Sequence, residues 1–153
     1  MGNAKAAPIS FTHSTRREVR TQFGALPWRR KDDKVQVMMI TSRGTGRWII
    51  PKGWPVPGQS PAEAAATEAF EEAGVTGKVS EIPLGMYSYT KTEVPNQGDL
   101  PCMVALFPLK VKKKHATFPE RTERRRKWMS PKKAAKLVDE PELRKIIKSF
   151  APD

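Results

Sequence analysis

The sequence contains a single cysteine, Cys102, so an internal disulfide is excluded and a reducing cytoplasm is the compartment that we expect. No apolar run approaches the roughly 20 residues that a bilayer span requires, and the first residues lack the apolar segment of a secretory signal. We therefore expect no membrane partner. No internal repeat is present, and 153 residues suffice for one domain with a buried core.

Acidic residues are scarce relative to basic ones. The 16 Asp and Glu residues face 28 Lys and Arg residues, which leaves a net charge of +12. Such a field attracts polyanions, including nucleic acids, anionic lipid surfaces and multiply phosphorylated metabolites. The basic residues form two clusters, at 16–31 and at 110–127. Runs of charge are equally compatible with a solvated surface, so charge alone does not choose a partner.

Periodicity predicts a mixed α/β (α+β) domain. Residues 1–20 are polar, basic and aperiodic, so we expect a flexible arm there and one domain over 21–150. A helix is expected at 61–73, and a second helical segment follows Ser130. Apolar and alternating runs predict strands at 22–29, 35–41, 47–50, 79–91, 103–109 and 127–129.

The helix at 61–73 has clear sequence boundaries. Ser60 and Glu63 can form a capping box, and Gly74 suits the left-handed residue that follows a last helical turn. The helix has one small apolar side that can lie close to a sheet, made of Ala62, Ala66, Ala69 and Ala73.

Three glutamates, Glu68, Glu71 and Glu72, share another side of this helix. Like charges at these spacings repel, and a hard divalent cation such as Mg²⁺ removes that cost while gaining oxygen ligands. A solvated acidic face is the alternative from spacing alone. The rigid loop at 51–59, rich in proline and glycine, favours a site, because it can bring backbone carbonyls to a metal while Lys52 faces phosphate.

The string from Gly53 to Val75 resembles the Nudix box, G-x5-E-x7-R-E-U-x-E-E-x-G-U, where U is a bulky apolar residue. The agreement covers Gly53, Glu68, Glu71, Glu72, Gly74 and Val75. Three positions depart from the pattern: Gln59 replaces Glu, Thr67 replaces Arg, and Ala69 replaces a larger aliphatic residue. Because Gln59 and Thr67 lose both charges together, a neutral hydrogen bond between them can substitute for the ion pair.

The resemblance implies a Nudix fold, in which helices sandwich a mixed β-sheet, and hydrolysis of a diphosphate bond with Mg²⁺, or Mn²⁺, as the cofactor. Glu68 and Glu72, with Gly53 from the loop, match metal-ligand positions of the family. Glu71 matches the position assigned as catalytic base or third ligand. Some members use a base from a late loop, for which the candidates are Glu120 and Glu123; surface ion pairs with Arg121 and Arg124 explain these two glutamates better.

The flanks of the box, within about 20–150, look most like the diphosphoinositol polyphosphate and diadenosine polyphosphate hydrolase branch. Four residues match its substrate-facing positions, with Arg126 as a further candidate cation: Arg20, Ser42, Arg43 and Lys52. The expected partner is therefore a highly phosphorylated small molecule.

Three alternatives stay open on the sequence. One is a pyrophosphatase for ADP-ribose or another nucleoside diphosphate derivative. Another is a catalytically weak Nudix-fold binding module. A nucleic-acid-binding module is the third, but no recognised motif supports it and it leaves the glutamates unexplained, so we expect no nucleic-acid partner. The sequence does not indicate an oligomeric state.

Overall fold

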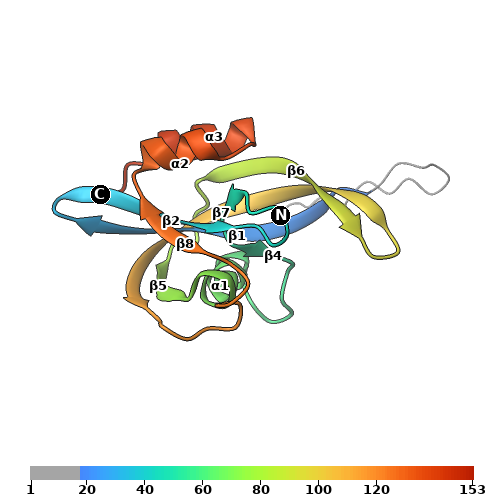
Figure 1. Cartoon of the computed structure of the whole chain (residues 1–153), viewed down its shortest axis with the longest axis horizontal. Coiled ribbons are helices and arrows are strands. Elements are labelled where there is room, and N and C mark those ends of the chain that lie inside the picture. The colour runs from blue at the N-terminus through green and yellow to red at the C-terminus, as the bar shows by residue number, and fades with distance from the viewer. Residues whose placement is uncertain (1–17) are drawn as a thin grey trace.

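The computed structural model describes residues 18–153, except for the side chain at position 93. A mixed sheet forms the centre, with α1 on one face and α2 and α3 on the other (Figure 1). The expected arm lies outside the described residues over 1–17, and Arg20 already begins the first strand. The strands are β1 (Arg20–Lys31), β2 (Lys34–Thr41), β3 (Trp48–Ile49), β4 (Lys52–Gly53), β5 (Val75–Val79), β6 (Gly85–Val94), β7 (Gly98–Lys114) and β8 (Arg126–Met129). The helices are α1 (Pro61–Glu68), its π-helical continuation η1 (Ala69–Ala73), α2 (Pro131–Leu137) and α3 (Pro141–Lys148).

The sheet is mixed, as expected. Its strands run in the order β3-β2-β1-β7-β5, while β4 pairs with β1, β6 with β7 and β8 with β2. Only the β1–β7 pair is parallel among the described strands. β1 and β2 form an antiparallel hairpin, and its turn places Asp32 and Asp33 at positive φ, which Asp tolerates better than most residues.

Both faces of the sheet are buried, because successive side chains of a strand point to opposite sides. In β2, Val37 and Met39 belong to the core beneath α2 and α3, while Met38 and Ile40 belong to the core beneath α1. The helix packs on the sheet through buried alanines, which are Ala62, Ala65, Ala69 and Ala73; Ala65 replaces the expected Ala66.

The structure differs from the sequence-based boundaries in several places. The strand β5 was not predicted apart from its last residue, and the strand expected at 79–91 begins only at Gly85. The residues between them leave the ladder around Pro83, while Ser80 and Leu84 still donate to carbonyls of β7. The strand expected at 103–109 is the longer β7. The C-terminal helical segment is two helices, because Val138 is extended and Pro141 begins α3. None of the helices in the described range is long and apolar enough to cross a membrane.

Candidate active site

The loop before α1 is fixed to the sheet at its start and to the helix at its end. Lys52 and Gly53 form β4 and pair with β1, opposite Gly24 and Phe23. At the other end, the predicted capping box is present: Ser60 N donates to Glu63 Oε1 at 2.8 Å, and Glu63 N donates to Ser60 Oγ at 3.1 Å. These contacts set the position of α1 relative to the loop.

Gly53 lies directly against the carboxylate of Glu68. A Cβ atom at position 53 would lie 2.6 Å from both carboxylate oxygens of Glu68, well inside van der Waals contact. The absence of a side chain at Gly53 therefore lets the loop backbone and the Glu68 carboxylate share one small space, as a common metal site requires.

The last helical turn is widened into the π-helix η1, which carries Glu71 and Glu72. Turns of this kind frequently occur at functional sites. The turn ends at Gly74, whose φ of 67° is left-handed and whose N–H donates to Phe70 O at 2.9 Å. Within η1, Glu72 is buried and Glu71 is only partly covered. The three glutamates of the predicted face are therefore not equivalent.

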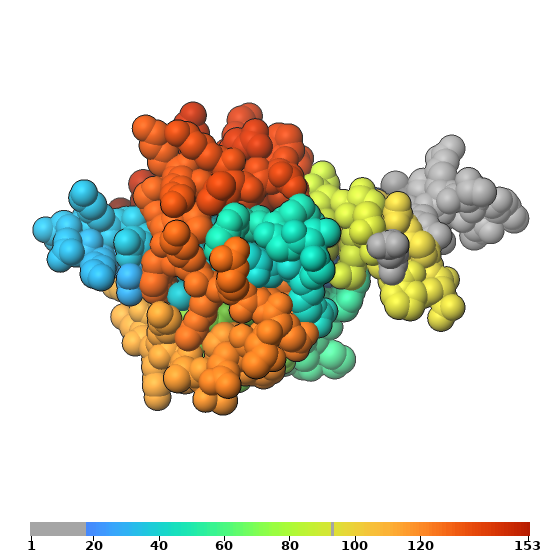
Figure 2. Space-filling view, viewed as in Figure 1, coloured from blue at the N-terminus to red at the C-terminus, as the bar shows by residue number. Residues whose placement is uncertain are grey.

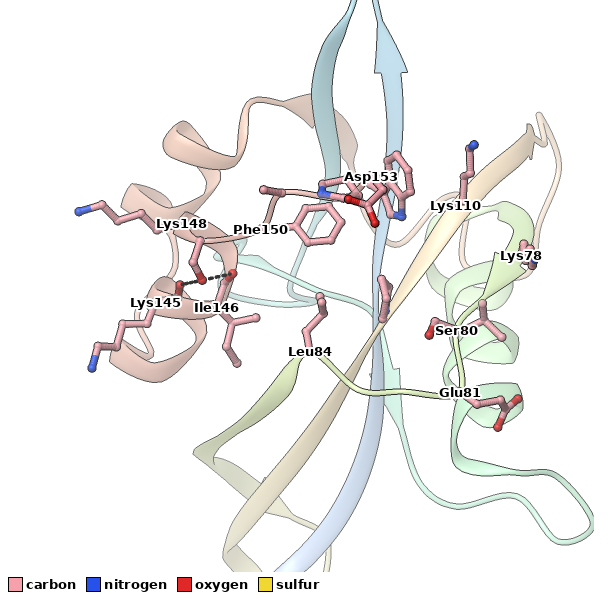
Figure 3. A pocket seen from close by; sticks show the side chains of 16 residues that line it. Lys78, Ser80, Glu81, Leu84, Lys110, Lys145, Ile146, Lys148, Phe150 and Asp153 are labelled. Atoms are coloured by element: carbon pink, nitrogen blue, oxygen red, sulfur yellow. Dashed lines mark hydrogen bonds between the residues drawn. The ribbon is translucent and has the colours of Figure 1, made fainter.

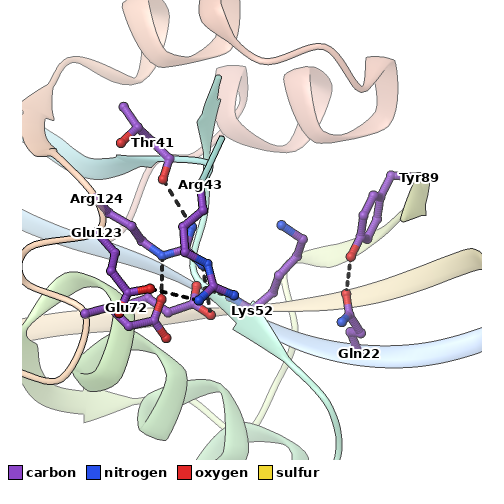
Figure 4. Close-up of polar contacts among 9 residues, drawn as sticks. Gln22, Thr41, Arg43, Lys52, Glu72, Tyr89, Glu123 and Arg124 are labelled. Atoms are coloured by element: carbon purple, nitrogen blue, oxygen red, sulfur yellow. Dashed lines mark hydrogen bonds and ion pairs between the residues drawn. The ribbon is translucent and has the colours of Figure 1, made fainter. Parts of the chain in front are cut away.

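A buried arginine, Arg124, joins Glu72 to the segment before β8. Its Nη2 lies 3.8 Å from Glu72 Oε2, its Nε donates to Glu120 Oε1 at 2.8 Å, and its Nη1 donates to Thr41 O at 3.1 Å (Figure 4). The backbone N–H of Glu120 also donates to Glu71 O at 3.0 Å. The guanidinium of Arg124 therefore connects Glu72, Glu120 and the backbone of Thr41.

Two carboxylates of this site, those of Glu68 and Glu72, have a pKa above that of a free glutamate. Burial, followed by the neighbouring charge of Glu72, raises the pKa of Glu68 to about 8. Burial also raises the pKa of Glu72, although Arg124 and Lys52 oppose the rise. A hydrogen bond between the two carboxyls raises the pKa of Glu68 and lowers that of Glu72. A divalent ion bound between them would favour the charged form of both.

The donor set suits Mg²⁺, which usually takes one or two carboxylates and completes its shell with water and phosphate oxygens. The two carboxylates of Glu68 and Glu72 and the backbone at Gly53 provide such a set. Within the described residues, no three Asp, Glu, His or Cys side chains form a ready-made metal cluster. The ligands available for Mg²⁺ are therefore the side chains of Glu68 and Glu72 and the loop backbone, and Glu71 lies at the edge of this site.

Two of the predicted phosphate-binding cations lie beside the cluster. Lys52 donates its backbone N–H to Glu72 Oε1 at 3.3 Å, and its buried ammonium lies 4.9 Å from the centre of the Tyr89 ring. Burial lowers the pKa of Lys52 to about 8. Arg43, in the turn after β2, pairs with Glu123 at 2.9 Å. Figure 2 shows this turn and the segment before β8 side by side on one face of the molecule.

The remaining predicted contacts lie farther out or are engaged in the fold. Arg20 donates to Gln97 at 3.3 Å, on the same face of β1 as Gln22. The hydroxyl of Ser42 accepts the N–H of Arg47 at 2.8 Å, which closes the β2–β3 turn. The guanidinium of Arg126 donates to backbone carbonyls of Ala73, Gly74 and His115, so it supports the helix end. Substrate contacts by Arg20 and Ser42 stay predictions.

The sequence did not predict that Arg124 and Glu120 lie in the candidate active site. Glu120 does pair with Arg124, as expected, but the pair is buried beside Glu72 rather than on the surface. Glu123 pairs with Arg43 instead of Arg121 or Arg124. A run of three arginines closely following an acidic residue was the available signal, and only tertiary contacts reveal which arginine turns inward.

The two neutral substitutions in the box do form the expected hydrogen bond. Thr67 Oγ1 lies 3.1 Å from Gln59 Oε1 and 3.1 Å from Glu63 O, so its single proton can bond to either acceptor. The loop is thereby linked to the helix without an ion pair.

Comparisons with known proteins agree with this arrangement. A family model described as NUDIX domain matches residues 19–150. The sequence is 32% identical over 123 residues to Nudix hydrolase 13, mitochondrial, of Arabidopsis thaliana, covering 78% of this chain and 61% of that relative's length. Over 52 residues it is 42% identical to diphosphoinositol polyphosphate phosphohydrolase 3-beta of Bos taurus, covering 34% of this chain and 31% of that protein. The crystal structure of the C. elegans Ap4A hydrolase superposes with a TM-score of 0.58 at 20% identity, covering 85% of this chain and 94% of that chain.

Proposed function

The chain belongs to the NUDIX domain family, and from that membership we propose that it hydrolyses a diphosphate bond in a highly phosphorylated small molecule with Mg²⁺ as the cofactor. The substrates that we propose are the diphosphoinositol polyphosphates or the diadenosine polyphosphates. Two of the relatives named above carry such substrates in their names, although one match is short and the other is of fold alone.

One arrangement carries the proposal: metal-ligand carboxylates lie beside buried cations in a single small site. Glu68 and Glu72, with the backbone at Gly53, would hold Mg²⁺, which supplies charge stabilisation for the leaving phosphate and a lower pKa for water. Lys52 lies next to Glu72 and would bind and orient phosphate oxygens, while Arg124 would hold the Glu72 carboxylate in position.

Glu71 is the proposed general base. In the described part of the chain its side chain has no ion-pair partner, so its carboxylate would be available to an attacking water. Glu120 is the second candidate, because it reaches the site through Arg124. Its salt bridge at 2.8 Å makes it the less available acceptor. Comparing the pH profiles of Glu71→Gln and Glu120→Gln tells the two roles apart.

A substrate panel tests the proposal. The protein is incubated with Mg²⁺ and either a diphosphoinositol polyphosphate, a diadenosine polyphosphate or ADP-ribose, and the products are separated by anion-exchange chromatography. We expect cleavage of a diphosphate bond, with a higher kcat/KM for one of the two polyphosphates. A higher kcat/KM for ADP-ribose would contradict this substrate class and favour the nucleoside diphosphate derivatives. No cleavage of any substrate would favour the binding module.

A further inference from the structure

A second groove lies on the opposite face of the sheet from Glu68 and Glu72. It runs between α3 with the C-terminal residues on one side and β5 with the following loop on the other (Figure 3). Its floor includes Trp28, which belongs to the core beneath α2 and α3, whereas α1 packs on the other core. The groove is therefore separate from the candidate active site.

Four lysines line this groove: Lys78, Lys110, Lys145 and Lys148. Lys78 lies directly opposite Lys110 in the β5–β7 ladder, and like charges at such positions repel. Lys145 and Lys148 are three residues apart on α3, on one side of the helix. None of the four forms an ion pair within the described residues. An anionic ligand would relieve both repulsions.

Apolar side chains also line the groove. Ile146 and Phe150 line it from α3 and its continuation, and Leu84 lines it from the loop, 37% exposed. Ile82, in the same loop, is 77% exposed. Large apolar side chains exposed beside a charged rim are typical of protein interaction sites.

We propose that this groove binds an acidic peptide segment of a partner protein, with bulky apolar side chains that enter between the lysines. The volume of about 1550 Å³ exceeds the roughly 300–1,000 Å³ of small-molecule sites. Stacking of nucleic-acid bases is disfavoured, because the Trp28 ring is buried, with Phe150 5.8 Å away and Lys110 over its face. The lysines outnumber the lining carboxylates of Glu81 and Asp153.

Segments of the same protein are poor occupants. Residues 1–17 contain Lys5, Arg16 and Arg17 but no acidic residue, so the lysines would repel them. A symmetric dimer through this groove would place lysines against lysines, because an isologous interface apposes the same patch on both copies. Charge complementarity therefore points to a different, acidic protein.

Fluorescence anisotropy tests the proposal with a fluorescein-labelled peptide that alternates acidic residues with Leu and Phe. We expect binding that the double variant Lys145→Glu/Lys148→Glu weakens about tenfold or more. The matched control Lys132→Glu/Lys136→Glu makes the same charge change on α2, outside the groove, and should weaken binding far less. Lys78→Glu, on the sheet side of the groove, should weaken binding as well. This result would show that the effect of the double variant does not come from local damage to α3.

Three further probes decide between ligand classes: a peptide with Ser in place of Leu and Phe, a single-stranded oligonucleotide, and phosphatidylserine vesicles. The peptide with Leu and Phe should bind more tightly than the peptide with Ser. The groove variants should not change the binding of the oligonucleotide or of the vesicles. Equal weakening by the control on α2 would overturn the proposal. So would groove-dependent binding of the oligonucleotide or the vesicles in place of the peptide.

Discussion

At the scale of single residues, the candidate active site depends on how Gly53, Glu68 and Glu72 share one space. Glu68 fits only because position 53 has no side chain, and Glu72 is held between Lys52 and Arg124. Glu72 raises the pKa of Glu68, and Lys52 and Arg124 in turn lower that of Glu72, so the charged residues of the site act as a unit.

Gly53→Ala tests the close approach to Glu68. The added Cβ would lie 2.6 Å from both carboxylate oxygens, so the flexible Glu68 side chain must move away. We expect kcat/KM to fall about 100-fold, as small displacements of catalytic groups do. The melting temperature should change little, because a side-chain end moves rather than the backbone. Unchanged kcat/KM would show that the position of Glu68 is not critical.

The raised pKa of Glu68 predicts how stability depends on pH. Its pKa is about 8 in the metal-free fold and about 4.5 when unperturbed, so the folded state binds the extra proton between these values. Stability of the metal-free protein should therefore fall as pH rises through this window. Mg²⁺ stabilises the folded protein by binding it and competes with that proton, so its effect on the melting temperature should grow from about pH 6 to about pH 8.5.

Differential scanning fluorimetry of the wild type and of Glu68→Gln, with and without Mg²⁺, measures this dependence. The variant cannot ionise at position 68, so its pH dependence should be shallower and its Mg²⁺ effect smaller. A stabilisation by Mg²⁺ that is the same at both pH values, or the same in the variant, would contradict the assignment of Glu68.

At the scale of elements, the two N-capping serines allow a matched comparison. Ser60 caps α1 and Ser130 caps α2, each by accepting a backbone N–H at 3.1 Å. Replacing either by Ala should lower the free energy of unfolding by about 1 kcal/mol. Only Ser60→Ala should also reduce kcat/KM, because α1 continues into the glutamates while α2 covers the other face. Equal activity of the two variants would mean that the helix start does not position the site.

Local sequence signals predicted the main elements well, and failed where tertiary contacts decide. The capping box at Ser60 and Glu63 and the alternation in β2 need only neighbouring residues, so both were predictable. The short strand β4 forms because its partner β1 is present, and two residues carry no periodicity. The inward turn of Arg124 depends on Glu72, which lies 52 residues earlier in the chain.

At the scale of the whole molecule, the net charge of +12 favours multiply charged substrates. We expect salt to weaken the binding of a polyphosphorylated substrate more steeply than that of ADP-ribose, because more charge pairs are screened. Arg43→Ala should raise KM about tenfold for the former and much less for the latter. Arg121→Ala, an exposed arginine of the neighbouring segment, is the control. Values of kcat/KM for both substrates at two salt concentrations check this. Equal salt dependence would show that the basic residues form a solvated surface and do not select the substrate.

The most direct measurement is hydrolysis of the preferred panel substrate as a function of free Mg²⁺, for the wild type and for Glu72→Gln. With excess chelator the wild type should lose activity, Mg²⁺ should restore it, and Ca²⁺ should bind but support little turnover. Glu72→Gln should stay folded with kcat/KM at least about 100-fold lower at saturating Mg²⁺, while the exposed-residue control Glu81→Gln should match the wild type. Full activity in excess chelator, or wild-type activity of Glu72→Gln, would contradict a metal site on this helix.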